Sequence, residues 1–235
     1  ITGFARSSGD FIALLDSDDL WESGYLAAMA DVFVRQPDVD FVFCNMALFG
    51  TRSGLMLQRG WHRRDRDLGL SVLLGCFEPR WQGVATSGNT LRRALMARIL
   101  ALPAEQVAQW RTRPDDCLFY GADILGGHKV YLAEPLARHR EHASNALLLD
   151  RSPLRRMRYA LRRERMLAHY REQIAAGPRL LTLARLEFRT KPRPTATEWR
   201  LYLGMAARSP QRLGRRLGDM LAITAHYLAS LRGAR

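Results

Sequence analysis

An apolar run that ends abruptly in carboxylates constrains the fold of this chain more than any other feature. Phe11 to Leu15 are five consecutive apolar residues, and Asp16, Asp18 and Asp19 follow at once. A run of this length is typical of a strand buried on both faces, as in a parallel sheet covered by helices. Ligands in open α/β sheets bind beyond the carboxyl ends of the strands. The sequence therefore predicts an α/β fold with an acidic site at the end of this strand.

The spacing of the aspartates suits a divalent cation. Two carboxylates in an Asp-x-Asp pattern repel each other unless a cation lies between them, and hard oxygen ligands are typical of Mg²⁺ or Mn²⁺. The alternative is a solvated turn that caps the next helix, because Asp is common in surface turns. The apolar strand before the aspartates and Leu20-Trp21 after them favour a site.

The whole stretch from Ala5 to Trp21 resembles the central motif of the family 2 glycosyltransferases, inverting enzymes of the GT-A fold. It reads Ala-Arg-Ser-Ser-Gly-Asp-Phe-Ile-Ala-Leu-Leu-Asp-Ser-Asp-Asp-Leu-Trp, and Ser7 stands where the family usually has alanine. The resemblance implies a Rossmann-like, mostly parallel sheet with flanking helices. It also implies a nucleotide-diphosphate sugar as donor, Asp18 and Asp16 as metal ligands, and Asp16 and Asp19 as donor-binding residues.

A second acidic pair opens the stretch Pro114–Gly126, where apolar residues at helical spacing follow Asp115 and Asp116. One interpretation is N-capping, since carboxylates at a helix start accept backbone N–H bonds and suit the helix dipole. The pair also resembles the (Glu/Asp)-Asp motif of the same family, and residues 130–136 match its Val-Tyr-Leu-x-Glu-Pro-Leu segment. The resemblance implies Asp116 as the catalytic base, with Asp115 orienting it or contacting the acceptor.

The stretch Thr86–Arg93 resembles the family segment that lines the acceptor side of the cleft. Its small and polar residues Ser87, Gly88 and Asn89 are then expected to bind the acceptor. Taken alone, Ser-Gly-Asn is simply a turn signal.

Residues 138–145 resemble the closing motif of the family, Tyr-Arg-x-His-x-x-(Asn/Ser), with His139 where an aromatic residue is usual. Arg140 and His142 are expected at the donor diphosphate, an anion that arginine binds bidentately. The alternative for these two residues is an exposed basic loop.

The resemblance covers about residues 1–146 and implies that the chain is truncated at its N-terminus. Relatives begin with a further strand–helix–strand region that grips the nucleotide base, and this chain begins at Ile1. We therefore expect residues 1–148 to form a partial GT-A domain that lacks its first strands and exposes an apolar sheet edge.

Several local elements follow from patterns along the chain. A helix is expected over about residues 22–36, a strand over 39–44 parallel to the first, and a short helix over 68–74. Residues 45–66 are expected to be irregular, with an exposed basic cluster of Arg59, His62, Arg63, Arg64 and Arg66. Near the C-terminus, Ser152-Pro153 predicts a helix start, residues 195–198 predict a capping box, and Ser209-Pro210 predicts the start of the last helix.

Charge is concentrated in residues 149–235, which we expect to form a basic amphipathic helical region. Residues 151–235 hold twenty Lys and Arg against five Asp and Glu, whereas residues 1–150 hold sixteen against eighteen. Helices with Arg on one side and Leu, Met and Tyr on the other can lie in an anionic bilayer surface. The alternative is that they pack on one another or on the catalytic domain. Nucleic acid is not expected, because aromatic and basic residues are not interleaved.

The expected function is metal-dependent inverting glycosyl transfer to a saccharide or lipid-linked acceptor, in cell-surface polysaccharide or lipopolysaccharide synthesis. The three cysteines have no paired spacing, which fits a reducing, cytoplasmic compartment, with peripheral attachment to the inner face of the plasma membrane as an extension. Nucleotidyltransferases and phosphatases also use Asp-x-Asp metal sites, but the Asp115-Asp116 helix and the 134–136 segment favour glycosyl transfer. The main alternative is an inactive fragment that acts at most as a membrane- or polyanion-binding module.

Overall fold

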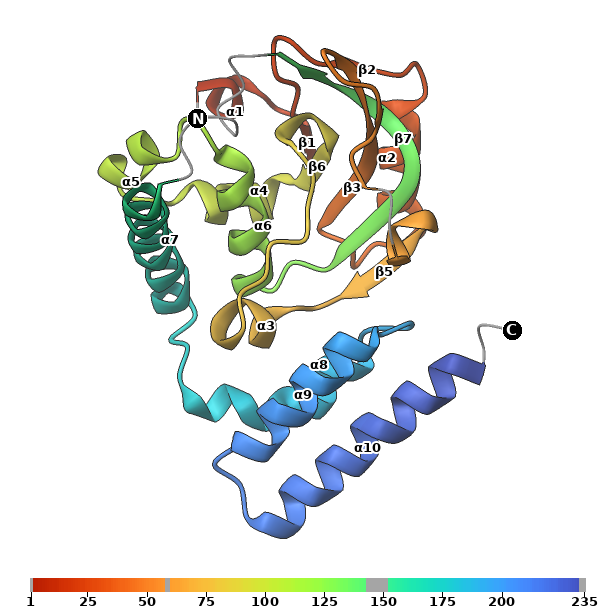
Figure 1. The fold of residues 1–235 in the computed structure, drawn as a ribbon, viewed down its shortest axis with the longest axis vertical. Coiled ribbons are helices and arrows are strands. Elements are labelled where there is room, and N and C mark those ends of the chain that lie inside the picture. The colour runs from red at the N-terminus through yellow and green to blue at the C-terminus, as the bar shows by residue number, and fades with distance from the viewer. Residues whose placement is uncertain (1, 58–59, 143–151, 233–235) are drawn as a thin grey trace.

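The computed structural model describes residues 2–57, 60–142 and 152–232, which form a curled sheet flanked by helices (Figure 1). This confirms the predicted α/β class. Arg59, Asn145 and the proposed boundary at residue 148 lie outside the described residues. In the described part of the chain, no helix is long and apolar enough to cross a membrane.

Five strands form the main sheet, in the order β1-β6-β3-β7-β2. Their bounds are Phe11–Ala13 (β1), Asn89–Arg92 (β6), Phe41–Gly50 (β3), Lys129–Glu141 (β7) and Leu20–Trp21 (β2), while β4 (Gly54–Leu55) pairs with β3 and β5 (Arg66–Gly69) pairs with β7. Among these pairings only β3 with β7 is parallel. The resemblance predicted a mostly parallel sheet, and for the described strands that prediction is wrong.

The physical reason is the position of β6. This strand lies between β1 and β3 and is antiparallel to both. β1 and β3 therefore run in the same direction, as a β-α-β unit requires, but they are not neighbours. β1 is also shorter than predicted, since Leu15 lies beyond its end and is 49% exposed.

Most of the helices and turns lie where the sequence patterns predict them. Their bounds are Thr2–Arg6 (α1), Tyr25–Arg35 (α2), Gly60–Arg63 (η1), Val72–Phe77 (α3), Thr86–Gly88 (η2), Arg93–Leu100 (α4), Ala104–Gln109 (α5), Pro114–Ile124 (α6), Pro153–Gln173 (α7), Pro178–Leu183 (η4), Ala184–Arg189 (α8), Ala196–Arg208 (α9) and Leu213–Arg232 (α10). The predicted cap at Ser152 and the capping box at Thr195 are both present. Residues 68–74 are not one helix, because they contain the end of β5, a turn and the start of α3.

Helices cover both faces of the sheet. On one face, Phe41 and Phe43 of β3 pack against Phe119 of α6, with ring centroids 5.0 and 5.2 Å apart. On the other face, the Tyr25 hydroxyl of α2 is 3.1 Å from the Thr90 hydroxyl of β6. The aromatic rings keep water from the strands on both sides, and this fixes the strand ends that carry the acidic residues.

The C-terminal helices belong to two different cores. Met166, Leu167 and Tyr170 of α7 join the core around the sheet, and the Tyr170 hydroxyl donates to the Ile99 carbonyl at 3.0 Å. Helices α8, α9 and α10 form a second core with Leu73 and Leu74 of α3. In packing, α7 therefore belongs with the sheet, although the sequence placed it in the C-terminal region.

A buried group of charges joins the two cores. Lys191 is 1% exposed, and its Nζ donates to the Leu68 carbonyl at 2.6 Å and the Ser71 hydroxyl at 3.0 Å. Arg66 pairs with Glu198 at 2.9 Å. Arg66 was expected in an exposed loop, but it is 8% exposed because its guanidinium meets this carboxylate from α9.

Candidate functional site

The loop that follows β1 is held in place by η2 and the start of β6. Leu14 donates its backbone N–H to the Asn89 carbonyl at 3.2 Å, and Asp16 donates its own to the Ser87 hydroxyl at 2.9 Å. The Trp21 indole donates to the Ser87 carbonyl at 2.8 Å. These bonds fix both ends of the segment 16–19, which we call the acidic loop.

The three residues expected to bind the acceptor lie beneath this loop. Ser87 and Asn89 are fully buried, and the Asn89 amide donates to the Ala85 and Thr86 carbonyls at 2.8 and 2.9 Å. A Cβ on Gly88 would lie 2.7 Å from Cγ2 of Val84, so close packing requires glycine there. Their visible role is to support the acidic loop, and acceptor binding by them stays a prediction.

The end of β7 brings Arg140 and His142 to the acidic loop. The Arg140 backbone N–H donates to Oδ1 of Asp19 at 2.9 Å, and its Nε donates to the Asp18 carbonyl at 2.9 Å. His142 Nε2 lies 3.1 Å from Oδ2 of Asp18. The structure thus brings together two segments that are 122 positions apart, and donor binding by them stays a prediction.

His139 is a member of the site that the sequence did not single out. Its Nδ1 lies 3.1 Å from Oδ1 of Asp19, and this hydrogen bond raises the pKa of the imidazole. Burial opposes ionisation of Asp19, but hydrogen bonds from His139, Ser87 and Arg140 outweigh it and lower the pKa of that carboxyl. The only sequence signal was the presence of a histidine where the resembled motif has an aromatic residue.

The pKa of Asp16 is shifted in the opposite direction to that of Asp19. Burial raises the pKa of its carboxyl, and the negative charges of Asp19 and Asp18 raise it further. A cation at this point would relieve the repulsion.

The described residues include no group of three His, Cys, Asp or Glu side chains placed to hold a metal ion. Mg²⁺ and Mn²⁺ sites need fewer, since such ions keep several waters and are held by one or two carboxylates plus substrate phosphates. The oxygens of Asp16 and Asp18 fit that type of site.

The second acidic pair consists of one fully buried residue and one partly exposed residue. Asp116 is fully buried, and its carboxylate pairs with Arg113 Nε at 2.8 Å and accepts the Tyr159 hydroxyl at 3.0 Å. Asp115 is partly exposed. Burial raises the pKa of Asp115 to about 6, and the negative charges of Asp116 and Asp16 contribute. Asp115 therefore lies within electrostatic range of the acidic loop.

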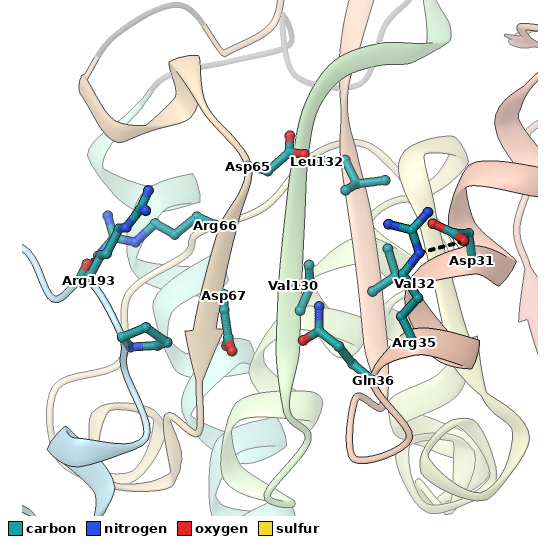
Figure 2. Close-up of a pocket in the computed structure, with 11 residues that line it drawn as sticks. Asp31, Val32, Arg35, Gln36, Asp65, Arg66, Asp67, Val130, Leu132 and Arg193 are labelled. Carbon is teal, nitrogen blue, oxygen red and sulfur yellow. Dashed lines mark hydrogen bonds and ion pairs between the residues drawn. The ribbon is translucent and has the colours of Figure 1, made fainter. Parts of the chain in front are cut away.

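The pocket in Figure 2 lies elsewhere. It has a volume of about 430 Å³ and lies between α2, β5, β7 and the segment around Arg193. Asp31 and Arg35 on its wall form an ion pair at 2.9 Å. None of the site residues predicted from the sequence lines this pocket, so we place the candidate site at the acidic loop on chemical grounds.

Comparison with known proteins finds similarity to a described glycosyltransferase sequence. No family model matches the chain. Over 149 residues, the chain is 30% identical to an uncharacterized glycosyltransferase of Nostoc sp., which covers 61% of this chain and 43% of the relative. The chain thus spans less than half the length of that protein.

One solved structure is similar in outline. The crystal structure of S. aureus TarS 1-349 matches 99% of this chain and 69% of its own length, at 14% identity and a TM-score of 0.44. That similarity is too low to establish a shared fold or function.

Proposed function

We propose that this chain forms the catalytic part of a glycosyltransferase, which moves a sugar from a nucleotide-diphosphate sugar to an acceptor hydroxyl with inversion. The observation that carries the proposal is the convergence of Asp16, Asp18, Arg140 and His142 at the end of β1. Asp115, the partly exposed member of the second acidic pair, is within electrostatic range of this group.

The donor diphosphate is the ligand for which this end of the sheet is suited. Arg140 is held in place by its bond to the Asp18 carbonyl and by Phe49, whose ring centroid lies 4.4 Å from the guanidinium carbon. A guanidinium fixed in this way can bind phosphate oxygens without a large loss of side-chain entropy. A divalent ion held by Asp16 and Asp18 would neutralise the diphosphate and make it a better leaving group.

We assign the base to Asp115, in place of Asp116, which the resemblance implied. A general base needs a carboxylate that reaches the acceptor and a pKa near the working pH. Asp116 is fully buried and already engaged by Arg113 and Tyr159, whereas Asp115 is partly exposed. Asp116 then acts as a positioning residue, because its two bonds fix the first turn of α6, on which Asp115 lies.

The Asp115 carboxylate takes up the proton of the reaction, and the diphosphate leaving group takes up the electron pair. The Asp115 carboxylate accepts the proton of the acceptor hydroxyl while that oxygen forms a bond to the anomeric carbon. The bond from this carbon to the diphosphate oxygen breaks, and the nucleoside diphosphate leaves with the electron pair. Attack on the face opposite the leaving group inverts the anomeric configuration. A saccharide or lipid-linked acceptor in cell-surface polysaccharide or lipopolysaccharide synthesis completes the proposal.

A turnover assay tests this function. We would express the chain alone and in a longer form that includes the adjacent coding sequence, and measure release of nucleoside diphosphate from a panel of nucleotide sugars with Mn²⁺. Asp18→Ala should abolish turnover. Asp31→Ala, in an exposed ion pair in the pocket of Figure 2, should leave it unchanged. Absence of turnover with every donor in both forms would contradict the proposal and favour the inactive-fragment alternative.

A further inference from the structure

Helix α10 carries an outward face that is apolar although it faces solvent. Its leucines at positions 213, 217, 221, 228 and 231 are 63, 51, 72, 51 and 50% exposed. Successive spacings of four, four, seven and three residues place them along one side of the helix. Figure 1 shows α10 at the outer boundary of the molecule, with its other side toward α8 and α9.

The inner face of α10 packs on the second core. The leucines of the outward face are therefore not core residues that have been turned toward solvent. Ile223 is buried in the second core, and the Tyr227 ring stacks on Trp199 with centroids 5.2 Å apart. His226 Nε2 lies 2.9 Å from the Lys191 carbonyl. A helix that is apolar on both its inner and its outer side is normally covered on both.

The outward face carries no charge over four turns. Between Leu217 and Leu231 the acidic and basic side chains are Asp219 and His226, and both turn inward. The Asp219 carboxylate is 15% exposed and accepts from the Gln211 amide at 3.2 Å. Gly218, Ala225 and Ala229 fill the remaining outward positions, so the face is smooth as well as apolar.

Arginines lie at both ends of α10. Arg212 and Arg215 are exposed at the N-terminal end, and Arg232 is exposed at the other end. At 3.6 residues per turn, Arg215 lies roughly 120–160° around the helix from the leucines, whereas Arg232 is next to Leu221 and Leu228 in projection. Arg232 is therefore suited to bind an anion that lies in the same plane as the leucines.

We propose that the outward face of α10 docks on an anionic lipid bilayer, with the leucines in the acyl boundary and Arg232 at the phosphates. The charge of the region decides between this partner and a second copy of the chain. The face itself is uncharged, but the region around it, residues 151–235, carries fifteen more basic than acidic residues, so an anionic surface attracts the region and a second copy repels it. The helix would lie in the interface, since it is not apolar enough to span a membrane. This inference does not depend on the proposed glycosyl transfer.

Vesicle flotation with the purified full chain tests the proposal. We expect the protein to float with vesicles of equal phosphatidylcholine and phosphatidylglycerol, and to remain at the bottom with phosphatidylcholine alone. Leu221→Glu should reduce the bound fraction about tenfold or more, because it places a charge at the centre of the face. Arg232→Gln should weaken binding and flatten its dependence on salt.

The matched control is Val34→Glu on α2, where the native side chain is 74% exposed and the change of charge is the same. It should float as the wild type does, and circular dichroism should show both glutamate variants folded. Equal flotation of Leu221→Glu and wild type would overturn the proposal. So would a wild-type dimer by light scattering that Leu221→Glu splits without any vesicle binding, because the face would then be an interface between copies.

Discussion

The Tyr159 hydroxyl of α7 donates a 3.0 Å hydrogen bond to Oδ2 of Asp116 at the start of α6. Burial raises the pKa of this tyrosine, and the neighbouring Asp116 charge raises it further, so the hydroxyl remains a donor at neutral pH. Arg113 approaches the same carboxylate from the preceding turn at 2.8 Å. A helix that follows the sheet domain in sequence therefore fixes the turn from which Asp115 extends.

Removing this hydroxyl should slow catalysis without weakening donor binding. Tyr159→Phe keeps the ring between Trp110 and Arg113 but deletes one bond to the Asp116 carboxylate, at a cost of about 1.5–3 kcal/mol in stability. We expect kcat to fall several-fold with an unchanged KM for the donor. Tyr227→Phe, which changes a ring stacked on Trp199 in the second core, is the control and should alter neither constant. Equal effects of the two substitutions would exclude a positioning role for Tyr159.

Turnover should also depend on pH through Asp115. Its pKa in the free protein is raised to about 6, and a base works only when deprotonated, so kcat/KM should fall as the pH decreases through about 6 and level off above it. The pH profile of kcat/KM for the wild type and Asp115→Asn measures this. The residual activity of Asp115→Asn should not fall at low pH. If it still falls, the group that titrates is not Asp115.

The buried charges between the two cores should matter for stability rather than for chemistry. Lys191→Met would leave the Leu68 carbonyl without its donor and remove a cation 3.5 Å from Glu198. Breaking a buried pair in this way costs roughly 3–5 kcal/mol. Urea unfolding should show that loss, whereas Arg189→Met, on the exposed side of α8, should change stability by less than about 0.5 kcal/mol. A loss for Lys191→Met no larger than that of the control would show that the charges do not hold the cores together.

Local patterns were sufficient for most of the helices and for the acidic loop. The helix caps at Ser152 and Thr195 depend on residues three positions away, so the sequence shows them directly. The strand order does not follow in the same way. Residues 89–92 read Asn-Thr-Leu-Arg, with neither an apolar run nor alternation, and they become β6 only because β1 and β3 leave a place between them.

The residues that support the site could not be predicted from the sequence either, because their contacts join segments that are far apart in the chain. Tyr159 is 43 positions from Asp116 and lies in a strongly basic helix, where nothing marks it as a contact. In the sequence, Arg66 does not differ from the other arginines near it. Its ion pair with Glu198 forms only because α9 packs beside β5. The acidic residues themselves were predictable, because a motif places them at the ends of their elements. Which carboxyl is buried depends on long-range packing.

The most direct test of the account is a paired measurement of donor affinity and turnover in Asp115→Asn and Asp116→Asn, in the form of the protein that is active in the turnover assay. We predict that Asp115→Asn binds the nucleotide sugar as the wild type does and loses about 10²-fold or more in kcat. Asp116→Asn should keep more activity and lose stability instead, because Arg113 loses its buried partner. Normal turnover in Asp115→Asn, with activity abolished in a folded Asp116→Asn, would contradict the assignment.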